Sequence, residues 1–290
     1  MNDLSFEKTI LVTGAGGQLG MELWKISDEF PSYKFLFATR ENLPIDNFKL
    51  VKNYFEQQQI DHCINCAAYT AVDKAESEKE KAFLINADAA GNLATVCKAH
   101  QTQLLHISTD YVFDGTALTP YKEEDKISPI NVYGASKLKG EELVLNNNSS
   151  AIIIRTSWVY SFFGNNFVKT MLRLLKEKEN IKVVSDQHGS PTYAADLAAV
   201  IMQIIKKEEN QSGIFNYCNE GVINWYDFAK AIKKFIKSKC SIHPITTSEY
   251  PTAAKRPQYS VLDTTKIKET FGINIPIWKD SLHKCLEILH

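Results

Sequence analysis

The sequence predicts an α/β protein in which a doubly wound parallel sheet is joined to a smaller C-terminal lobe. The chain has 290 residues, which fits about two domains or one large α/β domain with an elaboration. Apolar runs of strand length alternate with segments of helical spacing, and a glycine-rich turn follows the first run. Helices of this length between strands imply right-handed parallel crossovers, with helices on both faces of the sheet.

The alternation is regular up to about residue 160. The patterns predict strands over 9–13, 34–39, 62–65, 103–108 and 151–156, and helices over 18–27, 48–58, 78–100 and 134–145. Later segments predict helices over 166–177, 193–207, 226–237 and 278–290, a strand over 214–217, and loops over 185–193 and 244–257. We therefore expect a cofactor-binding domain over 1–160, partly interleaved with later segments, and a substrate-binding lobe over 161–290 that closes over the strand ends.

Composition and charge exclude several classes of protein. With 44% hydrophobic and 23% charged residues, the chain is not disordered, collagen-like or a small disulfide-stapled domain. Lys and Arg total 33 against 34 for Asp and Glu, so we expect no nucleic-acid or membrane partner. We expect a cytoplasmic protein, because no apolar run reaches the ~20 residues of a membrane span and no signal-peptide pattern is seen. Cys63 and Cys66 have the CxxC spacing of some metal sites. They lie in and just after a predicted strand, so we expect them to be buried thiols and not zinc ligands.

A glycine-rich loop, TGAGGQLG from Thr13 to Gly20, joins the first strand to the first helix. Gly14, Gly17 and Gly20 stand where a tight turn, a close approach of backbone NH groups to a pyrophosphate, and helix-on-strand packing need glycine. The helix N-terminus also favours negative charge. This position favours a Rossmann-like dinucleotide site over a purely structural turn.

The second predicted strand ends in Thr39 and Arg40, where NAD-binding proteins usually carry an acidic residue. An arginine can pair with a 2′-phosphate, so NADPH is favoured; the adjacent Glu41 leaves NADH possible. The alternative for Arg40 is a solvated surface charge. Asp46, also after this strand, could hydrogen-bond the adenine edge.

A tyrosine and a lysine four residues apart share one face of a helix, where the ammonium can stabilise a phenolate. This spacing occurs at Tyr133 and Lys137 and again at Tyr226 and Lys230. The first pair starts the helix after the fourth strand, whose end carries Thr109. We therefore predict that Tyr133, Lys137 and Thr109 are catalytic, and that the second pair is a core aromatic with a surface lysine.

The glycine loop and the Tyr-x-x-x-Lys pair resemble the extended short-chain dehydrogenase/reductases. Longer blocks resemble the family of dTDP-4-dehydrorhamnose reductases over nearly the whole chain: NCAAYTAVDKAE (65–76), STDYVFDG (108–115), PINVYGASKLKGE (129–141), RTSWVY (155–160) and DQHGSPT (186–192). The resemblance implies NADPH-dependent reduction of a 4-keto nucleotide sugar in dTDP-rhamnose synthesis for cell-surface polysaccharide, with Tyr133 as proton donor.

The resemblance also implies roles for individual residues. Those expected on the cofactor are Gly17, Gln18 and Leu19 at the pyrophosphate, Asp46 and Asn47 at the adenine, and Ala67, Ala68, Tyr69 and Thr70 along its length. Those expected at the sugar are Thr109, Asp110 and Trp158. Our candidates for the nucleotide half of the substrate are Arg256 for the diphosphate, with Asn165, Asn166, Gln187 and Thr192 as further contacts. The alternatives are a helix cap for Asn165 and a surface charge for Arg256.

Some members of this family are described as magnesium-linked dimers that use several glutamates, and the matching positions here are Glu22 and Ala195. Alanine cannot ligate, so no metal site is expected and Glu22 is the one ligand left for a possible Mg²⁺. The chain is expected to be a monomer or a homodimer. Tyr111 replaces the glutamate that sugar dehydratases use. A reductase forming 6-deoxy-L-talose, an epimerase and a non-catalytic NADP-binding regulatory subunit stay open as alternatives.

Overall fold

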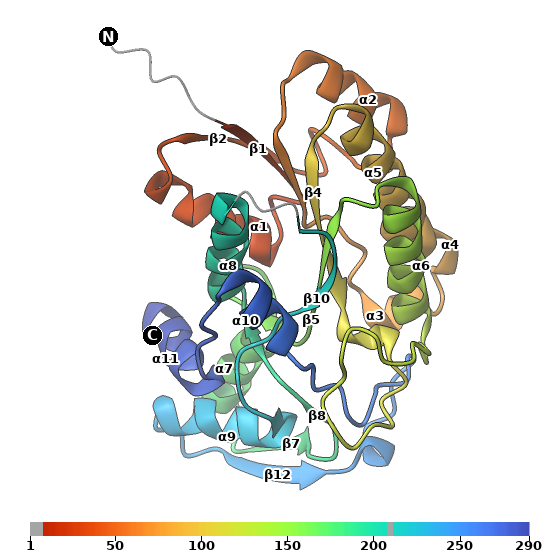
Figure 1. Ribbon diagram of the computed structural model, residues 1–290. Coiled ribbons are helices and arrows are strands. Elements are labelled where there is room, and N and C mark those ends of the chain that lie inside the picture. Colours follow the sequence, from red (N-terminus) through yellow and green to blue (C-terminus); the bar gives the residue numbers. More distant parts are fainter. Residues whose placement is uncertain (1–7, 208–210, 290) are drawn as a thin grey trace.

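The fold centres on a six-stranded parallel sheet, seen in a computed structural model that describes residues 8–207 and 211–289 (Figure 1). The strand order is β10-β5-β4-β3-β1-β2, and every neighbouring pair is parallel. The strands are β1 (Lys8–Thr13), β2 (Tyr33–Ala38), β3 (His62–Asn65), β4 (Gln103–Thr109), β5 (Ile152–Thr156) and β10 (Gly213–Asn216). The predicted fold class and all six strands of this sheet are confirmed.

Helices cover both faces of this sheet because successive strand residues point to opposite sides. Leu11 of β1 packs into one apolar layer with α2 (Phe48–Gln57), α5 (Ala89–Ala99) and α6 (Val132–Asn147). Ile10 and Val12 pack into the other layer, with α1 (Gln18–Ile26), α8 (Ala194–Lys207) and α10 (Thr265–Phe271). Figure 1 shows α1 and α8 to the left of the sheet and α2, α5 and α6 to its right. This is a doubly wound arrangement.

The helix predicted over 78–100 is interrupted. The structure has α4 (Lys79–Phe83), a π-helical turn over Leu84–Asp88, and then α5. Asn86 in this turn holds both backbone groups of Tyr69 and donates to Ser136 Oγ at 2.9 Å. These tertiary bonds, which helical spacing does not reveal, accompany the wider turn. A short helix, α3 (Val72–Ala75), was not predicted.

The C-terminal lobe packs α7 (Phe167–Glu177), α9 (Trp225–Phe235) and α11 (Trp278–Leu289) around its own apolar core, at the bottom of Figure 1. Its strands pair as β7 (Asn180–Val184) with β12 (Ser241–Ile245), β6 (Val159–Tyr160) with β9 (Thr192–Tyr193), and β8 (His188–Gly189) with β11 (Ile223–Asn224). The segments predicted as loops therefore contain short strands. The predicted helix 278–290 is confirmed up to 289, and position 290 lies outside the described residues.

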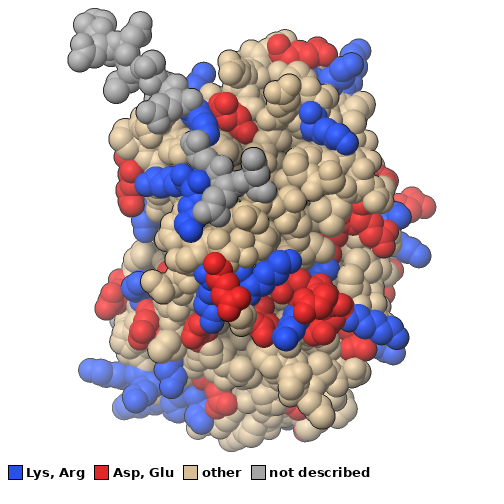
Figure 2. Space-filling model, in the orientation of Figure 1, with Lys and Arg blue, Asp and Glu red and all other residues tan. Residues whose placement is uncertain are grey.

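Charges are mixed on the surface. Basic and acidic side chains are interspersed over most of the face in Figure 2, apart from a basic group at its lower left edge. This matches the near-zero net charge of −1. Within residues 8–207 and 211–289, no helix is both long and apolar enough to cross a membrane.

Candidate functional site

A cavity of about 810 Å³ opens where the sheet strands end. Its walls come from the carboxyl ends of β1, β3, β4 and β5, from α1 and α6, and from the C-terminal lobe. The lining residues that were predicted from the sequence are Gly14, Gly17, Gln18, Leu19, Gly20, Arg40, Asp46, Ala67, Ala68, Thr70, Thr109, Asp110, Tyr133, Lys137, Trp158 and Asn165. The structure thus brings sixteen of the candidate residues together in one site.

The glycine loop is shaped as a dinucleotide site requires. Gly14 has φ +64°, and a Cβ there would lie 2.5 Å from the backbone nitrogen of Ala67. A Cβ on Gly20 would lie 2.6 Å from Ala15 Cα, so helix α1 can pack this closely only with glycine. Gly17 is the N-cap of α1, and the first turn carries no acidic side chain. The free NH groups of this turn are therefore open to a pyrophosphate.

At the adenosine end, Arg40 follows β2 as an exposed side chain on the cavity wall. Thr39 does not line the cavity. Its backbone NH donates to Asn42 Oδ1 at 2.7 Å and stabilises the turn that presents Arg40. Asn47 also lies off the cavity, because its side chain caps α2 by accepting from Leu50 NH at 3.1 Å.

The catalytic candidates meet at the start of α6. Asn131 caps this helix by accepting from Gly134 NH at 2.7 Å, which places Tyr133 in the first turn. The Tyr133 hydroxyl hydrogen-bonds with Thr109 at the end of β4. One turn later, Lys137 is 2% exposed and its Nζ donates to the Ile107 carbonyl at 2.6 Å.

Burial sets the protonation of this pair. It raises the pKa of Tyr133 to about 12, against the lowering effect of the Thr109 hydrogen bond. It lowers the pKa of Lys137 to about 8, against the raising effect of the Glu141 carboxylate. At neutral pH the phenol therefore holds its proton and the lysine is charged. A buried phenol that keeps its proton, one helical turn from a charged lysine, is suited to general acid catalysis.

Asp110 adds a buried carboxyl group next to Thr109. It is 2% exposed, and its Oδ1 accepts from Thr109 Oγ1 at 3.0 Å. Burial raises the pKa of Asp110 from 3.8 to about 7. Its Oδ2 is buried, and a hydrogen bond from Ser260 is the largest influence that opposes the rise in the pKa of Asp110.

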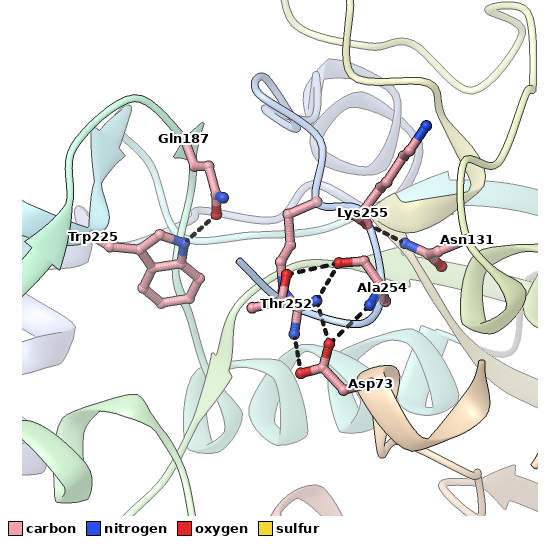
Figure 3. A network of polar contacts seen from close by, with 8 residues as sticks. Asp73, Asn131, Gln187, Trp225, Thr252, Ala254 and Lys255 are labelled. Atoms are coloured by element: carbon pink, nitrogen blue, oxygen red, sulfur yellow. Dashed lines mark hydrogen bonds and ion pairs between the residues drawn. The ribbon is translucent and has the colours of Figure 1, made fainter. Parts of the chain in front are cut away.

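Two tryptophans form an aromatic wall of the cavity. Trp158 and Trp225 stack with ring centroids 3.5 Å apart. Trp158 has φ +47°, which is uncommon for a bulky residue, and a Cβ on Gly189 would lie 2.6 Å from its ring. The indole nitrogen of Trp225 donates to Gln187 Oε1 at 3.2 Å (Figure 3). Gln187, predicted as a nucleotide contact, thus lies behind the wall, whereas Trp225 was not predicted.

Arg256, predicted to hold the diphosphate, is engaged in an ion pair. Its guanidinium makes two bonds to Asp73, of 2.8 and 2.7 Å, and one to the Ala254 carbonyl at 2.7 Å. Figure 3 shows Asp73 also receiving the Ala254 NH, and Asn131 bonding the Lys255 carbonyl. These contacts tie the loop segment 254–256 to α3 and to the start of α6. The guanidinium does not line the cavity.

The remaining candidates support the cavity from behind. Asn166 caps α7 and donates to Gln18 Oε1 at 2.8 Å. Thr192 is fully buried and bonds Thr156 at 2.9 Å. Tyr69 is held through its backbone by Asn86. The cavity wall does not include Asn166, Thr192 or Tyr69.

The second tyrosine-lysine pair and the possible metal ligand both lie elsewhere. Lys230 is exposed, pairs with Asp227 at 3.5 Å and covers the Tyr226 ring, outside this cavity. Glu22 is buried, and its Oε1 accepts from Ser161 Oγ at 2.6 Å. In residues 8–207 and 211–289, no three or more His, Cys, Asp or Glu side chains are grouped to hold a metal ion.

Comparisons with known proteins agree with this geometry. Residues 8–290 match the family described as RmlD substrate binding domain. A dTDP-4-dehydrorhamnose reductase of Aggregatibacter actinomycetemcomitans is 44% identical over 283 residues, 94% of this chain and 96% of that protein. Two crystal structures of dTDP-4-dehydrorhamnose reductases superpose with TM-scores of 0.93, each covering 97% of this chain and 99% of the other. They come from Clostridium acetobutylicum, at 40% identity, and from Bacillus anthracis in complex with NADP, at 39%. The chain therefore belongs to the RmlD substrate binding domain family, which it matches from the first strand of its sheet to its last helix.

Proposed function

We propose that this protein reduces the 4-keto group of dTDP-4-dehydro-L-rhamnose to give dTDP-L-rhamnose, with NADPH as the reductant. The observation that carries this proposal is that Tyr133, Lys137 and Thr109 line the same cavity as the glycine loop. The chain is also 44% identical to a dTDP-4-dehydrorhamnose reductase. Arg40 supports NADPH, because it is an exposed cation at the end of β2.

When bound, NADPH supplies the hydride. The protein's own task is to bind the anionic ligands and to provide a proton. Tyr133 gives its proton to the 4-keto oxygen as negative charge develops there. Lys137 stabilises the resulting phenolate, and Thr109 hydrogen-bonds the same substrate oxygen.

We take residues 1–160 as the cofactor-binding domain, completed by α8, β10 and α10, and the rest of 161–290 as the substrate-binding lobe that covers the sugar and nucleotide. The Trp158–Trp225 wall offers an apolar face to the sugar, and Asp110 on the cavity wall offers its carboxyl group to one of the sugar hydroxyls. Arg256, whose guanidinium is held by Asp73 and lies off the cavity wall, is our candidate for a part of the diphosphate that extends beyond the cavity. These groups all come from one chain, so a monomer suffices for the reaction. The six free cysteines suit the reducing cytoplasm.

Incubation of the purified protein with NADPH and dTDP-4-dehydro-L-rhamnose tests this function. We expect one NADPH consumed per dTDP-L-rhamnose formed, followed by absorbance and by chromatography of the product. Sugar isomerisation without net NADPH loss would identify an epimerase instead. NADPH binding without turnover would identify a regulatory subunit, and dTDP-6-deoxy-L-talose as product would place the opposite face of the ketone toward the hydride.

A further inference from the structure

A row of polar side chains crosses the sheet beneath the catalytic lysine. The strand register pairs Thr13 with Asn65 and Asn65 with His106, on three neighbouring strands. Thr13 Oγ1 donates to Asn65 Oδ1 at 2.7 Å, and Asn65 Nδ2 lies 2.9 Å from His106 Nδ1. All three are at most 1% exposed. The row ends at Lys137, whose Nζ is 3.4 Å from His106 Nε2.

This row fixes where His106 carries its proton. The backbone NH of Ala67 can only donate, and it points at Asn65 Oδ1 from 3.2 Å. The amide nitrogen of Asn65 must then face His106, so His106 Nδ1 accepts and has no proton. A protonated His106 ring would carry an N–H on both nitrogens, and these would face the Asn65 amide and Lys137 Nζ, which are themselves donors. Burial, followed by the charge of Lys137, accordingly holds the pKa of His106 well below its usual value. His106 is therefore neutral, with its proton on Nε2.

We propose that His106 is a positioning residue whose Nε2–H favours the neutral amine of Lys137 over its ammonium. An ammonium has no lone pair and cannot accept this N–H, which agrees with the long 3.4 Å separation. A neutral amine can accept it. The ammonium is held instead from other directions, by the Ile107 carbonyl at 2.6 Å and by the charge of Glu141.

The consequence is a lysine that readily passes a proton to its tyrosine, a role that rests on the proposed function. After Tyr133 has protonated the substrate oxygen, one proton moves from Lys137 Nζ to the phenolate oxygen. The lone pair left on Nζ accepts the His106 N–H, and His106 keeps its proton. A proton from bulk solvent, relayed by water in the cavity, then returns to Nζ. No electrons are transferred in these steps.

Other titratable groups around Lys137 leave this arrangement intact. The Cys66 thiol, beyond β3, has its pKa raised by burial and stays neutral. The Glu141 carboxylate, one turn along α6, is paired with Arg155 at 2.7 Å. Replacing His106 therefore changes the surroundings of Nζ without unpairing another charge.

The first test compares pH profiles of kcat/KM for the wild type, His106→Leu and His106→Gln. Leucine removes the opposing N–H, so the kinetic pKa of Lys137 should rise by about one unit. Glutamine can turn its Oε1 to the ammonium, so the pKa should rise further. The matched control is Thr13→Val, which leaves Ala67 to orient Asn65 and should not shift the profile. An unchanged or lowered pKa in His106→Leu would overturn the proposal.

A second test needs neither turnover nor a variant. Long-range ¹H–¹⁵N NMR spectra of the wild-type protein labelled at its 7 histidines report each ring's tautomer. His106, assigned through its contacts with Asn65, should remain a neutral Nε2–H ring from about pH 5 to about pH 8. A ring protonated on Nδ1 refutes the proposal. If His106 shows the expected tautomer but the protein does not reduce the sugar, the proposed function is refuted and the role of His106 is not.

Discussion

Replacing Asp110 by asparagine should make the protein more stable at neutral pH. The carboxyl group is 2% exposed, and burial raises its pKa from 3.8 to about 7. A folded pKa above the unfolded value means that the folded state binds the proton more tightly. The contribution of Asp110 to stability is therefore complete below about pH 4 and is lost as the pH rises to about 7.

The size of this effect follows from the pKa shift. About three units at 1.36 kcal/mol each give an upper limit of about 4 kcal/mol. Asparagine is uncharged and keeps an oxygen for the Thr109 hydroxyl, which lies 3.0 Å away. We expect Asp110→Asn to raise the free energy of unfolding by about 2 to 4 kcal/mol at about pH 8, with little change at about pH 4. Activity should fall, because the variant presents a donor where the substrate needs an acceptor.

Urea unfolding of both proteins across this pH range measures the difference. Asp114→Asn is the matched control of opposite sign, because hydrogen bonds from the Thr116 backbone and from Tyr121 lower the pKa of Asp114. That variant should lose stability at neutral pH and recover it in acid. A stability difference for Asp110→Asn that is independent of pH, or a loss at about pH 8, contradicts the reasoning.

Three further substitutions test other parts of the site. Tyr133→Phe should lower kcat by about 10² to 10⁴-fold with NADPH affinity unchanged, whereas Tyr226→Phe should turn over normally; steady-state kinetics and fluorescence titration separate the two effects, and near-normal turnover of Tyr133→Phe would sink the assignment. Arg40→Ala should weaken NADPH binding about tenfold or more and leave NADH binding nearly unchanged in the same titration, and equal losses would show that Arg40 does not meet the 2′-phosphate. Arg155→Leu leaves a buried carboxylate unpaired and should cost about 3 to 5 kcal/mol in urea unfolding, against less than about 1 kcal/mol for the exposed Arg173→Ala; similar losses would contradict this account.

Local motifs were sufficient to predict much of this site. The glycine loop and the Tyr133–Lys137 pair depend on neighbours within a few residues, so their spacing was visible in the sequence. Trp225 and His106 matter through partners on distant segments, and no local pattern marks them. The hydrophobic periodicity that predicted the sheet also passed over β7 and β12, in which only Ile181, Val183 and Ile245 are buried.

Three of the predicted residues that do not line the cavity share one explanation. Gln187, Thr192 and Asn166 each hold a side chain that does reach it. Motif resemblance locates such residues near the site but does not distinguish a ligand contact from its support. That distinction needs the hydrogen-bond partners, which only the folded chain supplies.

Two late elements, β10 and α8, complete the six-stranded sheet and its covering layer, and this constrains how the protein can fold during synthesis. Strand β10 supplies the edge beside β5, and α8 contributes Leu197, Ile201 and Ile205 to the layer that also holds α1. A nascent chain that has emerged only to residue 160 therefore exposes an unpaired strand edge and an uncovered apolar face. The cofactor domain should complete its folding only after residues 194–216 leave the ribosome. For the same reason, chimeras joined at residue 160 are expected to aggregate, whereas exchanges that keep α8 and β10 with the sheet are expected to fold.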